Sequence, residues 1–230
     1  MFTVSEQRDR ILACACELYL TDGLEGFSMR KLARNLGVTA PALYRHFEGK
    51  EQVLHEVVRE AYERFARHLY TALEGQTALE RFDLAGEGYL SFALAHPRLF
   101  EVLFAAPDHL GWGSVPKDLE AQACALGQFW NDRVRECMDA GILRRGNPED
   151  TAMTLWSHAH GLVTLFLRGR LRVDVEGFRK IYRDSHRRLF AGVATPEHGQ
   201  QLLEADAATP LTTKNDGGFA PHDHLYRTGT

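Results

Sequence analysis

Long apolar runs and a cysteine framework are both missing from this chain of 230 residues. No stretch reaches the roughly 18 consecutive apolar residues that a membrane-spanning helix requires, so we expect no membrane span. The four cysteines contain no Cys-x-x-Cys pair, which argues against both a zinc site and a disulfide scaffold. We interpret them as ordinary thiols of a protein in a reducing compartment.

A strong positive charge, a secretion signal and catalytic motifs are missing as well. The formal net charge of −4 excludes a globally basic nucleic-acid binder, but it leaves room for a local basic surface. The first residues, MFTVSEQRDR, lack the apolar core of a signal peptide, so we expect a cytoplasmic protein. No nucleophile elbow, phosphate-binding loop or HExxH motif occurs. We therefore expect no enzyme, no cofactor and no metal.

The apolar residues follow the period of a helix rather than that of a strand. Alternation of apolar and polar residues does not extend over any useful length. Apolar stripes at helical spacing occupy residues 11–19, 53–69, 89–94, 99–104, 119–138, 155–166 and 178–190. We predict an all-α protein. After Val193 the chain becomes polar and rich in Gly, Thr and Asp, which predicts a flexible tail over residues 194–230.

The stretch LGVTAPALYRHFEGKEQVL, residues 36–54, joins two short helical segments through Gly37-Val38. Ser28 can cap the first segment and Thr39 the second. Pro41 is tolerated near the start of the second segment, because an N–H in the first turn has no helical partner. This spacing predicts a helix-turn-helix at about residues 28–47.

One face of the second helix is left for a partner. Leu43 and Phe47 lie four residues apart and would anchor the helix on the core. Between Ser28 and Lys50 the chain has five Lys or Arg and one Glu, a net charge of +4 within an acidic chain. A phosphate backbone is the counter-surface that this charge favours.

The segment SMRKLARNLGVTAPALYRHFEGKEQVL resembles the DNA-binding domain of TetR-type transcriptional regulators, and the likeness runs from about Ser5 to Phe65. Its most specific part is a Tyr-x-x-Phe-x-x-Lys element, formed by Tyr44, Phe47 and Lys50. The resemblance implies a three-helix helix-turn-helix domain at 5–65, joined by a long fourth helix to a helical effector-binding and dimerisation domain at 66–193. It also implies a homodimer that leaves DNA when an effector binds.

The family's contacts can be carried over residue by residue. Tyr44, His46 and Lys50 match positions that hold phosphates. Arg30 matches a position from which an Arg reaches guanine in some members, and Arg45 could read a base or a phosphate. Without the resemblance, Tyr44 would be read as a core-edge aromatic and the arginines as a solvated face. The predicted DNA-contacting residues are Ser28, Arg30, Thr39, Ala40, Pro41, Tyr44, Arg45, His46 and Lys50.

Trp156, His160 and Gly161 fit a Trp-x-x-x-His-Gly signature that resembles one class of TetR-type C-terminal domains. His160 could be a buried, hydrogen-bonded histidine or an effector contact. It lies about 200° around a helix from His158, so the two do not suit one metal. The HDH tract at His222 to His224 is read as polar filler rather than a metal site.

The centre of the chain is rich in aromatic residues and poor in charge, which favours an apolar or aromatic effector. The predicted effector-binding residues are Phe92, Phe100, Phe104, Trp112, Phe129, Trp130, Trp156 and His160. The last two large helical segments, Asp150–Leu167 and Val175–Ala191, are predicted to form the dimer contact, because the first carries an apolar stripe wide enough to need a second copy. The predicted dimer residues are Leu155, Ala159, Leu162, Val163, Phe166, Phe178, Ile181 and Tyr182.

The leading hypothesis is a homodimeric regulator, a repressor, on a palindromic operator in double-stranded DNA. Two dimer-related recognition helices reach successive major grooves, which is why the operator should be palindromic. One alternative is a small-molecule binding or scaffold protein of the same fold that no longer binds a specific operator. Another is an unspecific nucleoid-type binder, which the acidic net charge disfavours.

Overall fold

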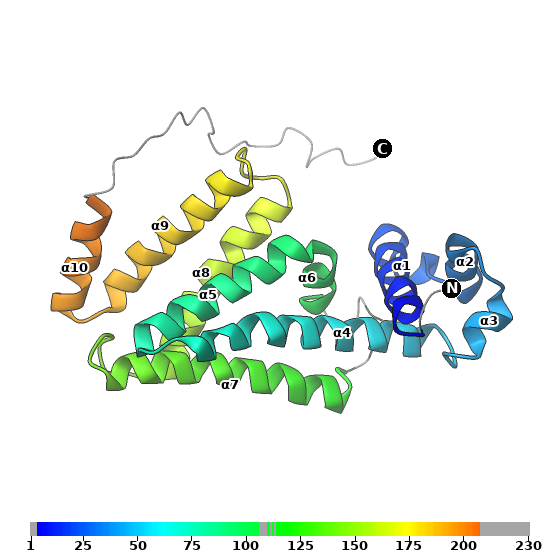
Figure 1. The fold of residues 1–230 in the computed structure, drawn as a ribbon, viewed down its shortest axis with the longest axis horizontal. Coiled ribbons are helices and arrows are strands. Elements are labelled where there is room, and N and C mark those ends of the chain that lie inside the picture. The colour runs from blue at the N-terminus through cyan, green and yellow to red at the C-terminus, as the bar shows by residue number, and fades with distance from the viewer. Residues whose placement is uncertain (1–3, 106–109, 111, 113, 208–230) are drawn as a thin grey trace, which may run out of the picture. The chain divides into compact units, whose positions relative to one another are not determined.

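The computed structural model describes residues 4–105, 110, 112 and 114–207, and this part of the chain is helical with no β-strand (Figure 1). The predicted all-α fold is confirmed. No helix in the described part is long and apolar enough to cross a membrane. The elements are α1 (Val4–Gly26), α2 (Met29–Leu36), α3 (Ala40–Tyr44), α4 (Lys50–Tyr70), the 3-10 helix η1 (Thr71–Glu74), α5 (Ala78–Ala95), α6 (Pro97–Leu103), α7 (Lys117–Asp139), α8 (Pro148–Leu167), α9 (Val175–Val193) and α10 (Pro196–Ala207).

The chain divides into two compact units. Unit 1 comprises the described parts of Met1–Glu74 and Glu87–Gln128, and unit 2 those of Gly75–Gly86 and Phe129–Thr230. Helices α5 and α7 each contribute residues to both units. The boundary predicted near residue 65 falls inside α4, which is continuous there, so it stays a prediction about function rather than a break in the fold.

Local hydrogen bonds define the turn between α2 and α3. The Ser28 hydroxyl oxygen accepts the Lys31 N–H at 3.2 Å and so caps α2. Gly37 ends the helix with a φ of +70°, a left-handed conformation that costs glycine little. The Val38 N–H then donates to the Ala33 carbonyl at 3.0 Å, which directs the chain into α3.

Unit 1 has a core shared by α1 to α4 and by α6. In Figure 1, α1, α2 and α3 gather around the first half of α4. The short helix α6 packs against both α1 and α4, and its Val102 is buried in the same core. Helices α4 and α5 approach closely at Gly88, where an added Cβ would lie 2.2 Å from the His68 carbonyl oxygen. The position therefore requires glycine.

Unit 2 contains α8, α9 and α10, with α9 packed against both of the others. Part of the predicted flexible tail is instead ordered as α10. The Thr195 N–H donates to the Ile142 carbonyl at 2.9 Å, Pro196 begins the helix, and Leu202 packs on the unit 2 core. A Cβ on Gly199 would lie 2.9 Å from the Ala191 carbonyl, so the glycine allows α10 to approach α9. Residues 208–230, including the HDH tract, lie outside the described part.

Candidate nucleic-acid interface

Helix α3 is held by its apolar side and presents its polar side to solvent. Leu43 and Phe47 are 1% and 6% exposed and belong to the unit 1 core, which confirms their predicted anchoring role. Eight of the nine predicted DNA-contacting residues are exposed, and the ninth, Ala40, is half-buried against that core. Tyr44 keeps 54% of its surface exposed, which does not fit a core-edge aromatic.

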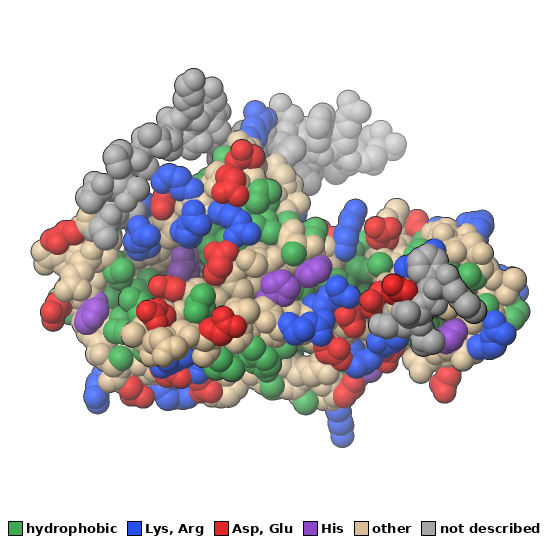
Figure 2. All heavy atoms as spheres, in the orientation of Figure 1, with side chains coloured by type: hydrophobic (Ala, Val, Ile, Leu, Met, Phe, Trp, Pro, Cys, Tyr) green, Lys and Arg blue, Asp and Glu red, His purple; other side chains and the backbone are tan. Residues whose placement is uncertain are grey.

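The cations around α3 differ in how they are paired. Lys31 forms an ion pair with Asp22 of α1 at 2.6 Å, which fastens α2 to α1. Within the described part of the chain, Arg30, Arg45 and Lys50 are exposed and have no acidic partner. Lys and Arg side chains are visible at the end of unit 1 formed by α2 and α3 (Figure 2). These unpaired cations can meet phosphates without first breaking an ion pair.

The two predicted caps behave differently. Ser28 uses its hydroxyl oxygen to cap α2, and its exposed side chain remains open to solvent. Thr39 occupies the N-cap position of α3, but its side chain makes no cap hydrogen bond. The Thr39 hydroxyl therefore keeps its hydrogen-bonding capacity for a partner at the start of α3.

Lys50 begins α4, directly after Gly49 in the N-cap position. The first N–H groups of a helix and its positive dipole end favour an anion, and a lysine in the first turn adds a mobile charge. The preceding turn is fastened by the Glu48 N–H, which donates to the Gln52 side-chain oxygen at 2.5 Å. This end of α4 therefore suits a phosphate.

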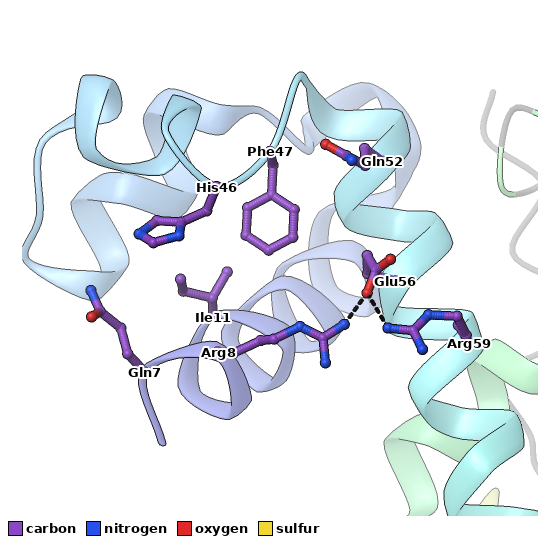
Figure 3. A pocket seen from close by; sticks show the side chains of 8 residues that line it. All are labelled: Gln7, Arg8, Ile11, His46, Phe47, Gln52, Glu56 and Arg59. Atoms are coloured by element: carbon purple, nitrogen blue, oxygen red, sulfur yellow. Dashed lines mark hydrogen bonds and ion pairs between the residues drawn. The ribbon is translucent and has the colours of Figure 1, made fainter. Parts of the chain in front are cut away.

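A cavity of about 380 Å³ lies between the first turns of α1, the turn after α3 and α4 (Figure 3). Glu56 of α4 accepts hydrogen bonds from Arg8 of α1 and from Arg59, the latter at 2.6 Å. Burial opposes ionisation of Glu56, but the hydrogen bonds and charges of both arginines outweigh it and lower its pKa. The cavity is lined by Gln7, Arg8, Ile11, His46, Phe47, Gln52, Glu56 and Arg59.

Of this lining, the sequence predicted a DNA contact for His46 and a core anchor for Phe47, and it placed Ile11 in the first apolar stripe. The Arg8–Glu56 pair spans a separation of 48 residues, and no local pattern indicates which acid an arginine on α1 will meet. The pair matters for the interface because it fixes the first turns of α1 against the helix that Lys50 begins.

Comparison with known proteins decides the family. The model of tetR-family bacterial regulatory proteins matches residues 11–57, and that of tetracyclin repressor-like C-terminal domains matches residues 82–189. The chain belongs to the TetR family. It is a DNA-binding transcriptional regulator, and the expectation that it is not an enzyme is confirmed because TetR regulators are not enzymes.

Individual relatives are distant. The HTH-type transcriptional regulator SAR2658 of Staphylococcus aureus is 27% identical over 106 residues, 46% of this chain and 57% of that protein. The HTH-type transcriptional repressor KstR2 of Mycolicibacterium smegmatis is 25% identical over 143 residues, 61% of this chain and 69% of that protein. A solved structure of a protein with unknown function from Rhodococcus sp. RHA1 has a TM-score of 0.67 and 26% identity, covering 82% of this chain and 95% of that one.

The residues predicted to bind an effector are divided between the two units of this TetR-family chain. Phe92, Phe100 and Phe104 lie in unit 1 with Phe65 and Tyr89, in what we call the aromatic cluster. Trp112 is also in unit 1, with its ring 6.4 Å from that of His55. The four others, Phe129, Trp130, Trp156 and His160, belong to unit 2. The set stays a prediction.

Within unit 2, Trp130 donates its indole N–H to the Ala152 carbonyl at 3.3 Å. Trp156 stacks on His160 with ring centroids 5.1 Å apart, and both side chains are half-buried. Burial, with a smaller effect of Arg168, lowers the pKa of His160. His158 is directed elsewhere, with its Nε2 3.0 Å from the Ser185 hydroxyl, so the two histidines do not share a partner in these contacts.

The residues predicted for the dimer interface are largely buried within one protomer. Leu155, Val163 and Phe178 are fully buried, and Ala159 and Tyr182 are each 3% exposed. The other three, Leu162, Phe166 and Ile181, are half-buried. The apolar stripe seen in the sequence thus serves mainly the α8–α9 contact, for example through the stacked rings of Phe166 and Phe178 at 4.1 Å.

Proposed function

We propose that this TetR-family protein is a homodimeric cytoplasmic repressor that binds a palindromic operator and leaves it when a small effector binds. The observation that carries the proposal is the arrangement of α3 and the turn after it. Leu43 and Phe47 lie in the core, whereas Tyr44, Arg45 and His46 are exposed to solvent. A short helix anchored in this way can enter a major groove without rearranging the core.

The exposed side chains divide into two tasks. Lys50 and His46 suit phosphate oxygens, which position the protein but carry no sequence information. Arg30, at the start of α2, has a guanidinium free of ion pairs among the described residues, and a free guanidinium can pair with guanine in bidentate geometry. Thr39 and Pro41 offer a hydroxyl and an apolar surface at the start of the recognition helix.

A second copy would cover the outer face of α8. Met153 is 58% exposed, and Trp156, His160 and Gly161 continue its face at helical spacing and are half-buried. An added Cβ on Gly161 would meet nothing within 4 Å, so the protomer itself does not require glycine there. A glycine without an internal reason suits the close approach of a partner helix.

Substitution of Gly161 by Leu tests the dimer. The wild-type protein should scatter light as a particle of twice the 26.0 kDa protomer mass, and Gly161→Leu should shift it toward the protomer. The matched control is Gly127→Leu, since Gly127 is also helical with nothing within 4 Å of its Cβ position. A wild-type monomer that still binds DNA tightly would contradict the dimer.

The release step needs an effector whose affinity differs between two arrangements of α4. The aromatic cluster supports this step, because it joins Phe65 of α4 to Phe92 of α5 at 5.0 Å, and α6 joins it through Phe100 and Phe104. Helix α6 also packs against α1 and α4, so a shift in the cluster would be felt by the DNA-binding helices. Within unit 1 the exposed edge of Phe104 is a candidate contact for an apolar or aromatic effector, and within unit 2 the half-buried Phe129 and Trp130 are separate candidates.

A genomic footprint with the purified protein tests the whole proposal. We expect protection of a few palindromic sites by the wild-type protein and not by a Lys50→Ala, Tyr44→Ala double variant. A folded protein that protects no site would favour the alternative of a small-molecule binding protein of the same fold. Protection without sequence preference would favour a nucleoid-type binder.

A further inference from the structure

Arg133 of α7 is a buried cation with donors that nothing in the described chain accepts. The residue is 7% exposed, and its Nε and Nη1 atoms are shielded from solvent without a hydrogen-bond partner among the described residues. Native proteins pair nearly all such groups, because water is lost on burial and only a new partner compensates for it. Two buried guanidinium nitrogens without a partner among the described residues therefore require an explanation.

The neighbours of Arg133 leave one positive charge without a counterpart. Its Nη2 donates to Glu136 Oε1 at 2.5 Å, and the other oxygen of Glu136 accepts Arg81 Nε at 2.8 Å. Two guanidiniums thus share one carboxylate. Asp83 acts on the buried Cys137 together with Glu136, Arg81 and Arg133, but the cation that acts on Asp83 itself is Arg187.

Aromatic side chains lie beside the Arg133 guanidinium. Its guanidinium carbon lies 4.5 Å from the centroid of the Phe129 ring, which covers one face of the cation. Phe129 and Trp130 are only half-buried, so this region of unit 2 is not sealed from solvent. The centroid of the Trp130 ring lies 5.1 Å from that of the buried Phe82 ring, so the apolar surface continues into the core of unit 2.

We propose that Arg133 binds the anionic head group of the effector, a carboxylate or a phosphate monoester, while the apolar body of the effector lies against Phe129 and Trp130. This inference rests on the proposed function and specifies it further, since it gives the apolar or aromatic effector an anionic head group. The Nε and Nη1 donors supply charge-assisted hydrogen bonds to the head group. Glu136 holds the guanidinium in place through Nη2.

A purely structural role of Arg133 would leave a different signature. Arg135, on the same helix, shows it: its side chain is 45% exposed and forms an ion pair with Asp132 at 2.5 Å. A charged residue that only keeps a helix face polar would be exposed and paired in the same way as Arg135. Replacement of Arg133 by Met removes a buried cation but leaves Glu136 paired with Arg81, so no uncompensated carboxylate results and the fold should lose little stability.

The test uses the full chain without DNA and measures binding by calorimetry and by thermal shift. The probes are decanoate and decyl phosphate, with decanol as the neutral analogue of both. We expect wild-type protein and the control Arg135→Met to bind one of the two anions at least tenfold more tightly than decanol. Arg133→Met should lose this preference and bind all three probes alike, and Arg133→Lys should restore part of it. The urea midpoint of unliganded Arg133→Met should lie close to that of wild type.

Three outcomes would overturn the inference: no anion preferred over decanol by wild type, an unchanged preference in Arg133→Met, or an equal loss in Arg135→Met. If Arg133→Met does not fold, Arg133→Gln, which keeps hydrogen-bond donors without the charge, takes its place with the same expectations. Release from operator DNA is measured separately by fluorescence anisotropy. Binding of the anion without release would contradict the proposed function and leave the Arg133 site standing.

Discussion

Basic side chains are exposed in one region of this protein and shielded from solvent in another. Around α3, the cations Arg30, Arg45 and Lys50 are exposed and unpaired within the described chain. In unit 2, Arg133 is buried with two nitrogen atoms that have no partner among the described residues. His186 is half-buried, but both of its ring nitrogens are shielded from solvent and likewise have no partner in the described part of the chain. Exposed cations cost little, because water solvates them until a phosphate replaces it. Buried polar groups have lost that water already, so they must affect either stability or ligand binding.

This difference teaches how each region should respond to solution conditions. Contacts made by exposed cations weaken with salt, because counterions return to the phosphates that the cations release. Buried groups are screened far less, and they respond instead to pH or to substitution. Salt and pH therefore separate the two regions experimentally.

The largest predicted effect is a loss of folding stability at acidic pH, caused by protonation of His186. Burial, with a smaller effect of His158, lowers its pKa from 6.5 to about 4, so the neutral form is the one that fits the fold. Because the unfolded chain takes up the proton first, stability should fall as the pH drops from 6.5 toward 4, by up to about 3 kcal/mol. The ring stacks between Phe82 and Tyr182, which a phenyl ring can imitate.

Urea unfolding at pH 7 and pH 4.5 checks this expectation. His186→Phe should lose most of the stability difference between the two pH values that wild type shows. His198→Phe, on α10, serves as a control that should leave the difference as it is in wild type. If the stability of wild type and of His186→Phe depended on pH in the same way, the shielded histidine of unit 2 would not differ from the exposed cations in its response to pH.

The next effect concerns base recognition by Arg30. Arg30→Ala should reduce discrimination at one base pair in each half-site by about 1–3 kcal/mol, because one bidentate contact with guanine is lost. Competition assays with operators mutated at single positions measure this effect. Equal weakening on operator and on random DNA would reassign Arg30 to the phosphate backbone.

A smaller effect is expected from the phosphate contacts. Lys50→Ala and His46→Ala should weaken binding to every DNA sequence alike, and the Lys50 variant should make the slope of log affinity against log salt shallower by about 0.9 per contact. Lys117→Ala is the matched control, since Lys117 also begins a helix and is exposed. Affinities at several salt concentrations decide the matter, and a wild-type slope in the Lys50 variant would rule out the contact.

The smallest effect separates two caps that look alike in the sequence. Ser28→Ala should cost about 1 kcal/mol of stability, because its oxygen caps α2. Thr39→Ala should cost less, because the Thr39 side chain makes no cap hydrogen bond. Thermal unfolding of both variants measures the difference, and a larger cost for Thr39 would mean that its hydroxyl is used within the fold.

The local structure of the helix-turn-helix followed from the sequence alone. The cap at Ser28, the turn at Gly37 and the anchoring of Leu43 and Phe47 depend on residues at most four apart. The family also followed from one contiguous stretch, from about Ser5 to Phe65, whose most specific part is the element that ends in Lys50. Side chains this close in sequence have few alternative arrangements, so residue type and spacing were sufficient.

Partners distant in the chain were decided only by the tertiary structure. Nothing in the sequence distinguishes Arg133 and Glu136 from an exposed ion pair at i and i+3, and only the packing of unit 2 buries the guanidinium. The apolar stripe around Leu155 was predicted to be a dimer surface. Leu155 itself is buried within the protomer, where α8 packs against α9. The sequence predicted a polar tail where α10 is found. A helix there depends on its contact with α9, which the sequence does not show. Burial depends on which remote surfaces meet, and residue spacing along one helix shows that a face is apolar without showing what will cover it.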